Sequence, residues 1–233
     1  MRKQNLLRKA AQQSLPIKSP FKKYSEIVTG EAVSDQRLFT VHKVGDKSYY
    51  EVPFDLLGTD MLLVSRISKI GDGLGGGYTT AGSKSNEQVI HWSRIQNSII
   101  LRSISFDNVA ADSFPIFLSV EANNYNPILA TFKIEAFNSD STATLIEVNE
   151  LFLSDIPALS GLSSSMRKQY QVRNLDRERS FITRMASYPE NIEVRHDIQC
   201  FCPPFEFTNR YNFHGNESVH VFASQAAYAA KIT

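Results

Sequence analysis

The sequence has few of the features that mark specialised classes of protein. Its 233 residues include only 2 cysteines, and no apolar run is long enough to span a bilayer as a helix. Cys200 and Cys202 are one residue apart, which is a poor geometry for a disulfide between them. The cysteines therefore predict no disulfide framework, and they leave the redox compartment open.

Charge of one sign is not in excess either, since 25 basic residues stand against 24 acidic ones. Such a balance offers no strong field to attract nucleic acid or anionic lipid, and we expect neither as a partner. The basic start MRKQNLLRKAAQQSLP is followed by no apolar segment, so we expect no signal peptide in this chain. We interpret residues 1–21 as a flexible basic arm.

The main catalytic signatures are also missing. The sequence has no G-x-S-x-G, no H-E-x-x-H and no P-loop, so we expect no catalytic residue in this chain. His42, His91 and His196 are isolated in β-rich runs, and we interpret them as structural or surface residues.

The only arrangement that suggests a metal site lies near the C-terminal end of the sequence. The order of Cys200, Cys202, His214 and His220 resembles a Cys2His2 zinc site, but the two cysteines are too close together for the usual spacing. Residues i and i+2 of a strand share a face, so two thiolates could reach one ion. The alternative is that the cysteines are small core residues and the histidines strand residues. We predict no structural zinc and no cofactor.

A glycine-rich stretch, GDGLGGG at residues 71–77, matches the spacing G-x-G-x-x-G of dinucleotide-binding loops. That motif works when the loop opens a helix whose N-terminal amides meet the pyrophosphate. The residues that follow, GYTTAGSKSNEQ, are poor formers of a helix interior and lead into another β pattern. We therefore expect a loop between two strands, without affinity for nucleotides.

The rest of the pattern predicts a mainly β protein built from antiparallel hairpins, in a sandwich-like or barrel-like arrangement with one or two short helices. Turn signals at Gly45-Asp46, Gln96-Asn97 and residues 138–141 each separate two β-rich runs. A helix is expected near 176–187, with Asp176 as its cap and Pro189 after its end.

We divide the chain into four parts on these signals. They are the basic arm at 1–21, a small leading β domain at 22–70, a Gly-rich loop at 71–84 and a larger β-rich domain at 85–233 that includes the predicted helix.

Five stretches carry a resemblance to a known family: KKYSEIV, LFTVHKVGDKSYYEVPFDLLGTDMLLVSRISK, QVIHWSRIQNSIILRS, NNYNPILATFKIEAFNSDSTATLIEVNELF and LDRERSFITRMASYPENIEVRHD. Together they resemble the N-terminal region of large bacterial zinc-dependent metalloproteases of gluzincin type. In that family a short leading domain and a longer domain of unknown function precede the catalytic part. The resemblance runs from about Lys22 to Asp197 and does not extend past CFCPPFEF.

The resemblance implies a secreted, periplasmic or outer-envelope peptidase whose H-E-x-x-H lies downstream of the region seen here. Zinc is then expected only in the catalytic domain, and no family catalytic residue can be placed on this chain. The expected function is a noncatalytic accessory module that packs on the catalytic domain or presents a peptide or protein substrate. We expect the packing surface in the apolar stretch at 221–233.

Two alternatives of other classes stay open. One is a stand-alone β-rich binding or adhesion module, because β domains with exposed loops commonly serve that purpose. The other is a small metal-binding protein that uses the Cys/His cluster. The chain itself is interpreted either as a part of a longer protein or as a stand-alone version of the accessory region.

Overall fold

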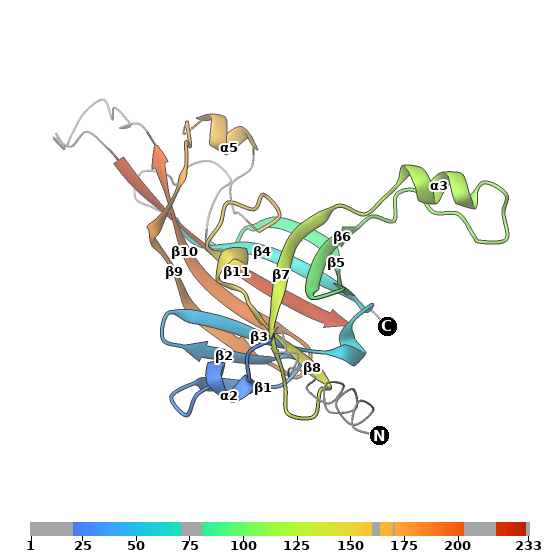
Figure 1. Cartoon of the computed structure of the whole chain (residues 1–233). Helices are drawn as coiled ribbons and strands as arrows, with labels where there is room; N and C mark the ends of the chain where they lie inside the picture. The colour runs from blue at the N-terminus through green and yellow to red at the C-terminus, as the bar shows by residue number, and fades with distance from the viewer. Residues whose placement is uncertain (1–20, 71–80, 160–163, 170, 203–217, 232–233) are drawn as a thin grey trace, which may run out of the picture.

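The computed structural model describes residues 21–70, 81–159, 164–169, 171–202 and 218–231. Most of these residues are in strands, which confirms the mainly β prediction (Figure 1). The strands are β1 (Val33–Gln36), β2 (Thr40–Val44), β3 (Lys47–Pro53), β4 (Asp60–Ile70), β5 (Lys84–Ile95), β6 (Ser98–Ile104), β7 (Ile128–Phe137), β8 (Ala143–Glu147), β9 (Leu175–Ser187), β10 (Ile192–Cys202) and β11 (Ser218–Lys231). The helices are α2 (Tyr24–Ile27), α3 (Phe117–Asn123), α4 (Asn149–Phe152) and α5 (Ser164–Gln169), with a 3₁₀ turn at Phe54–Leu56.

All strand pairs are antiparallel, in the order β1-β2-β3-β8-β7-β6-β5-β4-β11-β10-β9. The two end strands approach each other, since Leu38 N donates to Tyr188 O at 3.1 Å and Ser187 Oγ donates to Phe39 O at 2.6 Å. No ladder joins β1 to β9 in the described residues, so the sheet is strongly curved but not closed into a barrel.

The three hairpins predicted from turn signals are present. Gly45, with φ of 58°, turns β2 into β3, and Gln96, with φ of 53°, turns β5 into β6. The third turn joins β7 to β8, where Asn138 N donates to Ala143 O at 3.2 Å. The glycine-rich stretch connects β4 and β5, which are antiparallel neighbours, although residues 71–80 themselves lie outside the described residues.

One continuous core lies against the curved sheet. Its largest fully buried side chains include Trp92, Tyr50 and Phe39, whose rings contact one another edge to face with centroids 5.8–6.5 Å apart. Helix α4 adds Leu151 and Phe152 to this core. A second, smaller cluster packs Ile27 of α2 with residues of β3, β7 and β8.

The helix predicted near 176–187 is wrong, because this segment is strand β9. It pairs with β10 through a tight turn in which Tyr188 N donates to Asn191 O at 2.7 Å, so Pro189 belongs to a hairpin turn. Asp176 does accept a hydrogen bond from Arg179 N at 3.2 Å, as a cap would. That contact lies within the β9–β10 register shift, which separates the Phe181–Asp197 pair from the Asp176–Gln199 pair. Pairing with β10 outweighs the local helical pattern.

Two further sequence predictions fall partly or wholly outside the described residues. The basic arm predicted at 1–21 is one of them, since only Phe21 is described. The centroid of the Phe21 ring lies 4.8 Å from that of Phe137. The Gly-rich loop predicted at 71–84 is the other, since residues 71–80 are not described and Lys84 already belongs to β5. Among the described helices, none has the length and apolar character needed to cross a lipid bilayer.

Candidate functional site

Residues 105–127, called the arm below and distinct from the basic arm at 1–21, leave the sheet between β6 and β7. They carry α3 away from the rest of the molecule (Figure 1). Ten large apolar side chains are exposed among the described residues, and seven of them lie on this arm or at its junction with β7. They are Phe106, Val109, Phe114, Ile116, Leu118, Tyr125 and Ile128. A concentration of exposed apolar side chains of this kind marks an interaction surface.

Hydrogen bonds between polar groups hold the backbone of the arm in place, while its large apolar side chains face the solvent. Arg102 donates to Asn126 O at 2.9 Å and lies 4.8 Å from the ring centroid of Tyr125, so β6 holds the base of the arm. Farther out, Asn124 donates to Val120 O at 2.7 Å, and Asn108 donates to the Asn124 side chain at 3.0 Å. The arm therefore presents a defined apolar projection.

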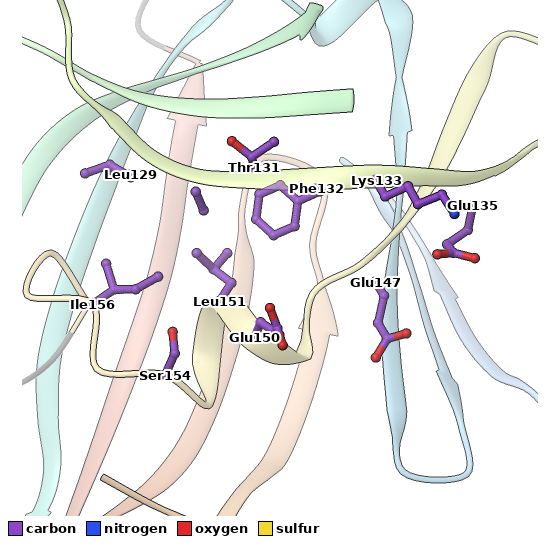
Figure 2. Close-up of a pocket in the computed structure, with 11 residues that line it drawn as sticks. Leu129, Thr131, Phe132, Lys133, Glu135, Glu147, Glu150, Leu151, Ser154 and Ile156 are labelled. Carbon is purple, nitrogen blue, oxygen red and sulfur yellow. The ribbon is translucent and has the colours of Figure 1, made fainter. Parts of the chain in front are cut away.

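Where the arm returns to the sheet, a pocket of about 400 Å³ lies along β7. This volume is in the range of pockets that hold small ligands. Figure 2 shows β7 on one side and α4 with the following loop on the other. The lining residues are Leu129, Ala130, Thr131, Phe132, Lys133, Glu135, Glu147, Glu150, Leu151, Ser154 and Ile156.

The pocket exists because the neighbour of β7 on this side ends early. β6 pairs with β7 from Ile128 to Lys133, whereas the β7–β8 ladder begins only at Ile134. After Glu147 the chain leaves the sheet and forms α4, whose Leu151 fills the core beneath the pocket. The N-terminal half of β7 is thus paired with a strand on one side only, and its other edge borders the pocket.

Three carboxylates stand at the β8 end of the pocket, each with a cation on its outer side. Lys22 contacts Glu135 at 2.9 Å, Lys47 contacts Glu147 at 2.7 Å and Arg177 contacts Glu150 at 3.1 Å. The hydrogen bonds that the two lysines donate to Glu135 and Glu147 raise the pKa of Lys22 and of Lys47. All three cations are more than half exposed, so these are weak surface pairs that can exchange with charges of a ligand.

A polar network on the small N-terminal strands has the residue types of a catalytic triad. Ser34 Oγ lies 2.7 Å from His42 Nδ1, and His42 Nε2 lies 3.2 Å from Glu51 Oε2. The same carboxylate accepts hydrogen bonds from Tyr24 at 2.7 Å and from Asn138 at 3.1 Å. The hydrogen bond from His42, followed by those from Tyr24 and Asn138, lowers the pKa of Glu51 against the opposing effect of burial.

This network connects several elements of the fold. A cavity of about 220 Å³ borders His42 between β1–β2 and β9, but Ser34 is not among its lining residues. The network instead ties α2, β1, β2, β3 and the β7–β8 turn together. His196 is also buried, where its ring contacts the carbonyl of Phe152, and His91 Nδ1 lies 3.1 Å from Asp60. The structural or surface roles of the three histidines stay predictions.

The structure brings two of the four predicted zinc candidates into register. Cys200 of β10 is opposite His220 of β11, while Cys202 is opposite Ser218. Cys200 is buried, and His214 lies outside the described residues. Within the described part of the chain, no group of three or more histidine, cysteine or acidic residues is arranged to hold a metal ion. The absence of structural zinc stays a prediction.

Sequence reasoning did not find the arm or the pocket. We expected the packing surface at 221–233, and residues 221–231 of that stretch belong to β11, which pairs with β10 and β4. That expectation stays a prediction. The arm had a signal in the sequence, because the segment FDNVAADSFPIFLSVEANNYNP has no β alternation although it separates two strands. The open edge of β7 had none, since it depends on where β8 ends.

Comparison with protein families gives two matches that together span most of these elements. A domain of unknown function, DUF5118, matches residues 21–70, and a second, DUF5117, matches residues 82–223. No curated protein and no solved structure matches the chain. Because the second match covers more than half of the 233 residues, the chain belongs to the DUF5117 family, with a DUF5118 domain ahead of that region.

Proposed function

We propose that this chain is a noncatalytic accessory module of a secreted or envelope-associated bacterial zinc metalloprotease, and that it packs on the catalytic domain through the arm. The resemblance of residues 22–197 to the N-terminal region of gluzincin-type enzymes motivates the choice of partner. The observation that carries the packing role is the arm, where seven large apolar side chains are exposed on one projection.

The chemistry of the arm fits a protein partner. Phe114, Ile116, Leu118 and Tyr125 are each more than 60% exposed, and aromatic and aliphatic anchors of this kind supply most of the binding energy in interfaces. The charge balance of the chain gives no general attraction to a polyanion. Packing against a catalytic domain would remove these side chains from water and stabilise both partners.

The experiment adds the catalytic domain of a gluzincin-type relative to the purified chain and measures the melting temperature and the sedimentation of the mixture. A partner that binds only the folded chain stabilises it by about 2.7 kcal/mol at a concentration 100 times Kd. We expect a rise in melting temperature and a co-sedimenting complex. The double variant Phe114→Ser, Leu118→Ser should lose both.

Phe181→Ser is the matched control, because Phe181 is 58% exposed and Phe114 is 61% exposed, but Phe181 lies on β9 outside the arm. This variant should bind as the unmodified chain does. An unchanged melting temperature with the catalytic domain present would contradict the packing role, and equal losses in both variants would show that the arm has no special part.

A stand-alone binding module is the second candidate, and the pocket at β7 is the observation that favours it. Such a module would bind a peptide or protein without any catalytic domain. The two candidates differ in whether the catalytic domain changes the melting temperature. The metal-binding alternative would instead require zinc bound by the purified chain and lost on Cys200→Ser.

A further inference from the structure

The open edge of β7 is a hydrogen-bonding surface as well as a pocket wall. Ile134 N donates to Asn97 O, on the β6 side, at 3.1 Å. Because backbone groups alternate along a strand and the β6–β7 register is continuous from Lys133 to Ala130, the N–H and C=O of Thr131 point away from β6. They point toward the side on which no strand is paired with this part of β7.

Leu129 extends this edge in an irregular way. The register passes from Leu101–Ala130 to Arg102–Ile128, so Leu129 is the extra residue of a bulge and has no strand partner. Bulges and lysines on an edge limit uncontrolled pairing with other strands. With the bulge at Leu129 and Lys133 at the other end, the open stretch is suited to a short segment.

The pocket beside this edge has an apolar part and an acidic part. Leu129, Leu151 and Ile156 line one end, and Glu147 and Glu150 stand toward the other (Figure 2). Of the four charged residues in the lining, three are acidic and Lys133 is the fourth. The cations that now contact the carboxylates lie on exposed side chains outside the lining, so a basic group of a ligand can replace them.

We infer that this groove binds a short extended peptide segment, which adds as a strand to the edge of β7 at Leu129–Lys133. Main-chain hydrogen bonds to Thr131 would set the alignment, as in other cases of strand addition. An apolar side chain of the segment enters between Leu129, Leu151 and Ile156, and a lysine or arginine of the segment contacts Glu147 or Glu150. The inference holds for a substrate or for a partner, and it does not depend on the metalloprotease resemblance.

The experiment uses the full chain and a pool of synthetic seven-residue peptides. Each peptide has valine or isoleucine at two alternate positions, lysine or arginine at the centre, and random residues elsewhere. Enriched peptides are labelled and titrated by fluorescence anisotropy. We expect saturable binding that weakens at least about tenfold when the peptide backbone is N-methylated at alternate residues, because main-chain bonds are then lost.

Two variants test the location. Thr131→Pro removes a backbone N–H that points away from β6. A sheet tolerates proline at such an edge position, so the fold should be kept while peptide binding weakens about tenfold. Ser154→Trp leaves every strand unchanged and fills the pocket, so it should abolish binding. Ser25→Trp, at an exposed position of α2 that does not line the pocket, is the matched control and should bind normally.

The inference is overturned if no peptide is enriched, or if N-methylated peptides bind as tightly as their parents. It is also overturned if folded Ser154→Trp protein binds the enriched peptides normally. Each of these three results leaves the test of the arm unaffected, because that test measures binding of the catalytic domain and changes only Phe114 and Leu118. Tighter binding after glutamate replaces the central lysine or arginine of an enriched peptide would contradict the assigned role of Glu147 and Glu150.

Discussion

At the scale of single residues, Glu51 connects a helix, a strand and a turn that are far apart in the sequence. Its carboxylate accepts hydrogen bonds from Tyr24 of α2, His42 of β2 and Asn138 of the β7–β8 turn. On the other side of the ring, His42 Nδ1 lies 2.7 Å from the hydroxyl oxygen of Ser34. One side chain thus holds a helix and a turn against the small N-terminal strands.

Glu51→Gln tests this connection. The substitution replaces one acceptor oxygen by an NH2 group that faces other donors, so we expect a loss of about 1–3 kcal/mol in the free energy of unfolding. Urea denaturation followed by tryptophan fluorescence measures it. Glu150→Gln is the control, because the side chain of Glu150 is 77% exposed and should change stability by less than about 0.5 kcal/mol. Equal effects of the two variants would contradict a structural role for the network.

At the scale of elements, His196 links β10 to α4, the helix under the pocket. Its ring donates a hydrogen bond from Nδ1 to Phe152 O. The centroids of the His196 and Phe152 rings lie 5.8 Å apart, with an angle of 90° between the ring planes. Burial disfavours the charged form and lowers the pKa of His196 below its ordinary value of 6.5, although the carbonyl and Asp197 oppose the shift. Burial therefore favours the uncharged ring at this position.

This shift predicts a loss of stability in mild acid. Above the unfolded pKa of 6.5 neither state is protonated, whereas at lower pH the unfolded chain binds a proton that the folded chain resists. Stability should fall as pH drops below 6.5, until the folded pKa is reached. His196→Gln keeps a donor for the carbonyl and should show a shallower fall in melting temperature. Parallel pH profiles of the two proteins would refute this role for His196.

At the scale of the whole molecule, two stretches matched by separate domain families share one sheet. β3 pairs with β8, and β4 pairs with both β5 and β11, so residues 21–70 contribute strands on two sides of the later part of the chain. The same sheet supports the arm and the open edge of β7. One curved sheet thus supports both of the interaction surfaces that we propose.

We predict that this chain alone hydrolyses no peptide bond. A gluzincin-type enzyme needs two histidines on one helix to hold zinc and a glutamate to activate water, and the sequence has no H-E-x-x-H. Rigorously purified protein should release no fragments from casein, with or without added zinc. Cleavage that a chelator stops and zinc restores would overturn the prediction. Fusion of a relative's catalytic domain is the positive control.

The sequence by itself was sufficient for the features that depend on neighbouring residues. Alternating apolar residues and turn signals at Gly45, Gln96 and residues 138–141 predicted three hairpins, because a hairpin needs only two short runs and the turn between them. The same alternation predicted the fold class. The G-x-G-x-x-G spacing was assigned to a connection between strands for the same local reason.

Tertiary structure alone decided the features that depend on distant partners. Residues 176–187 have a helical pattern and a cap-like Asp176, yet β10 pairs with this segment and makes it a strand. The pocket exists because β8 stops pairing at Ile134 and the chain turns into α4, and no local pattern records where a neighbouring strand ends. Exposure of the arm likewise depends on which side chains the curved sheet covers. Strand pairing and burial are properties of residues far apart in sequence, so they become visible only in the folded chain.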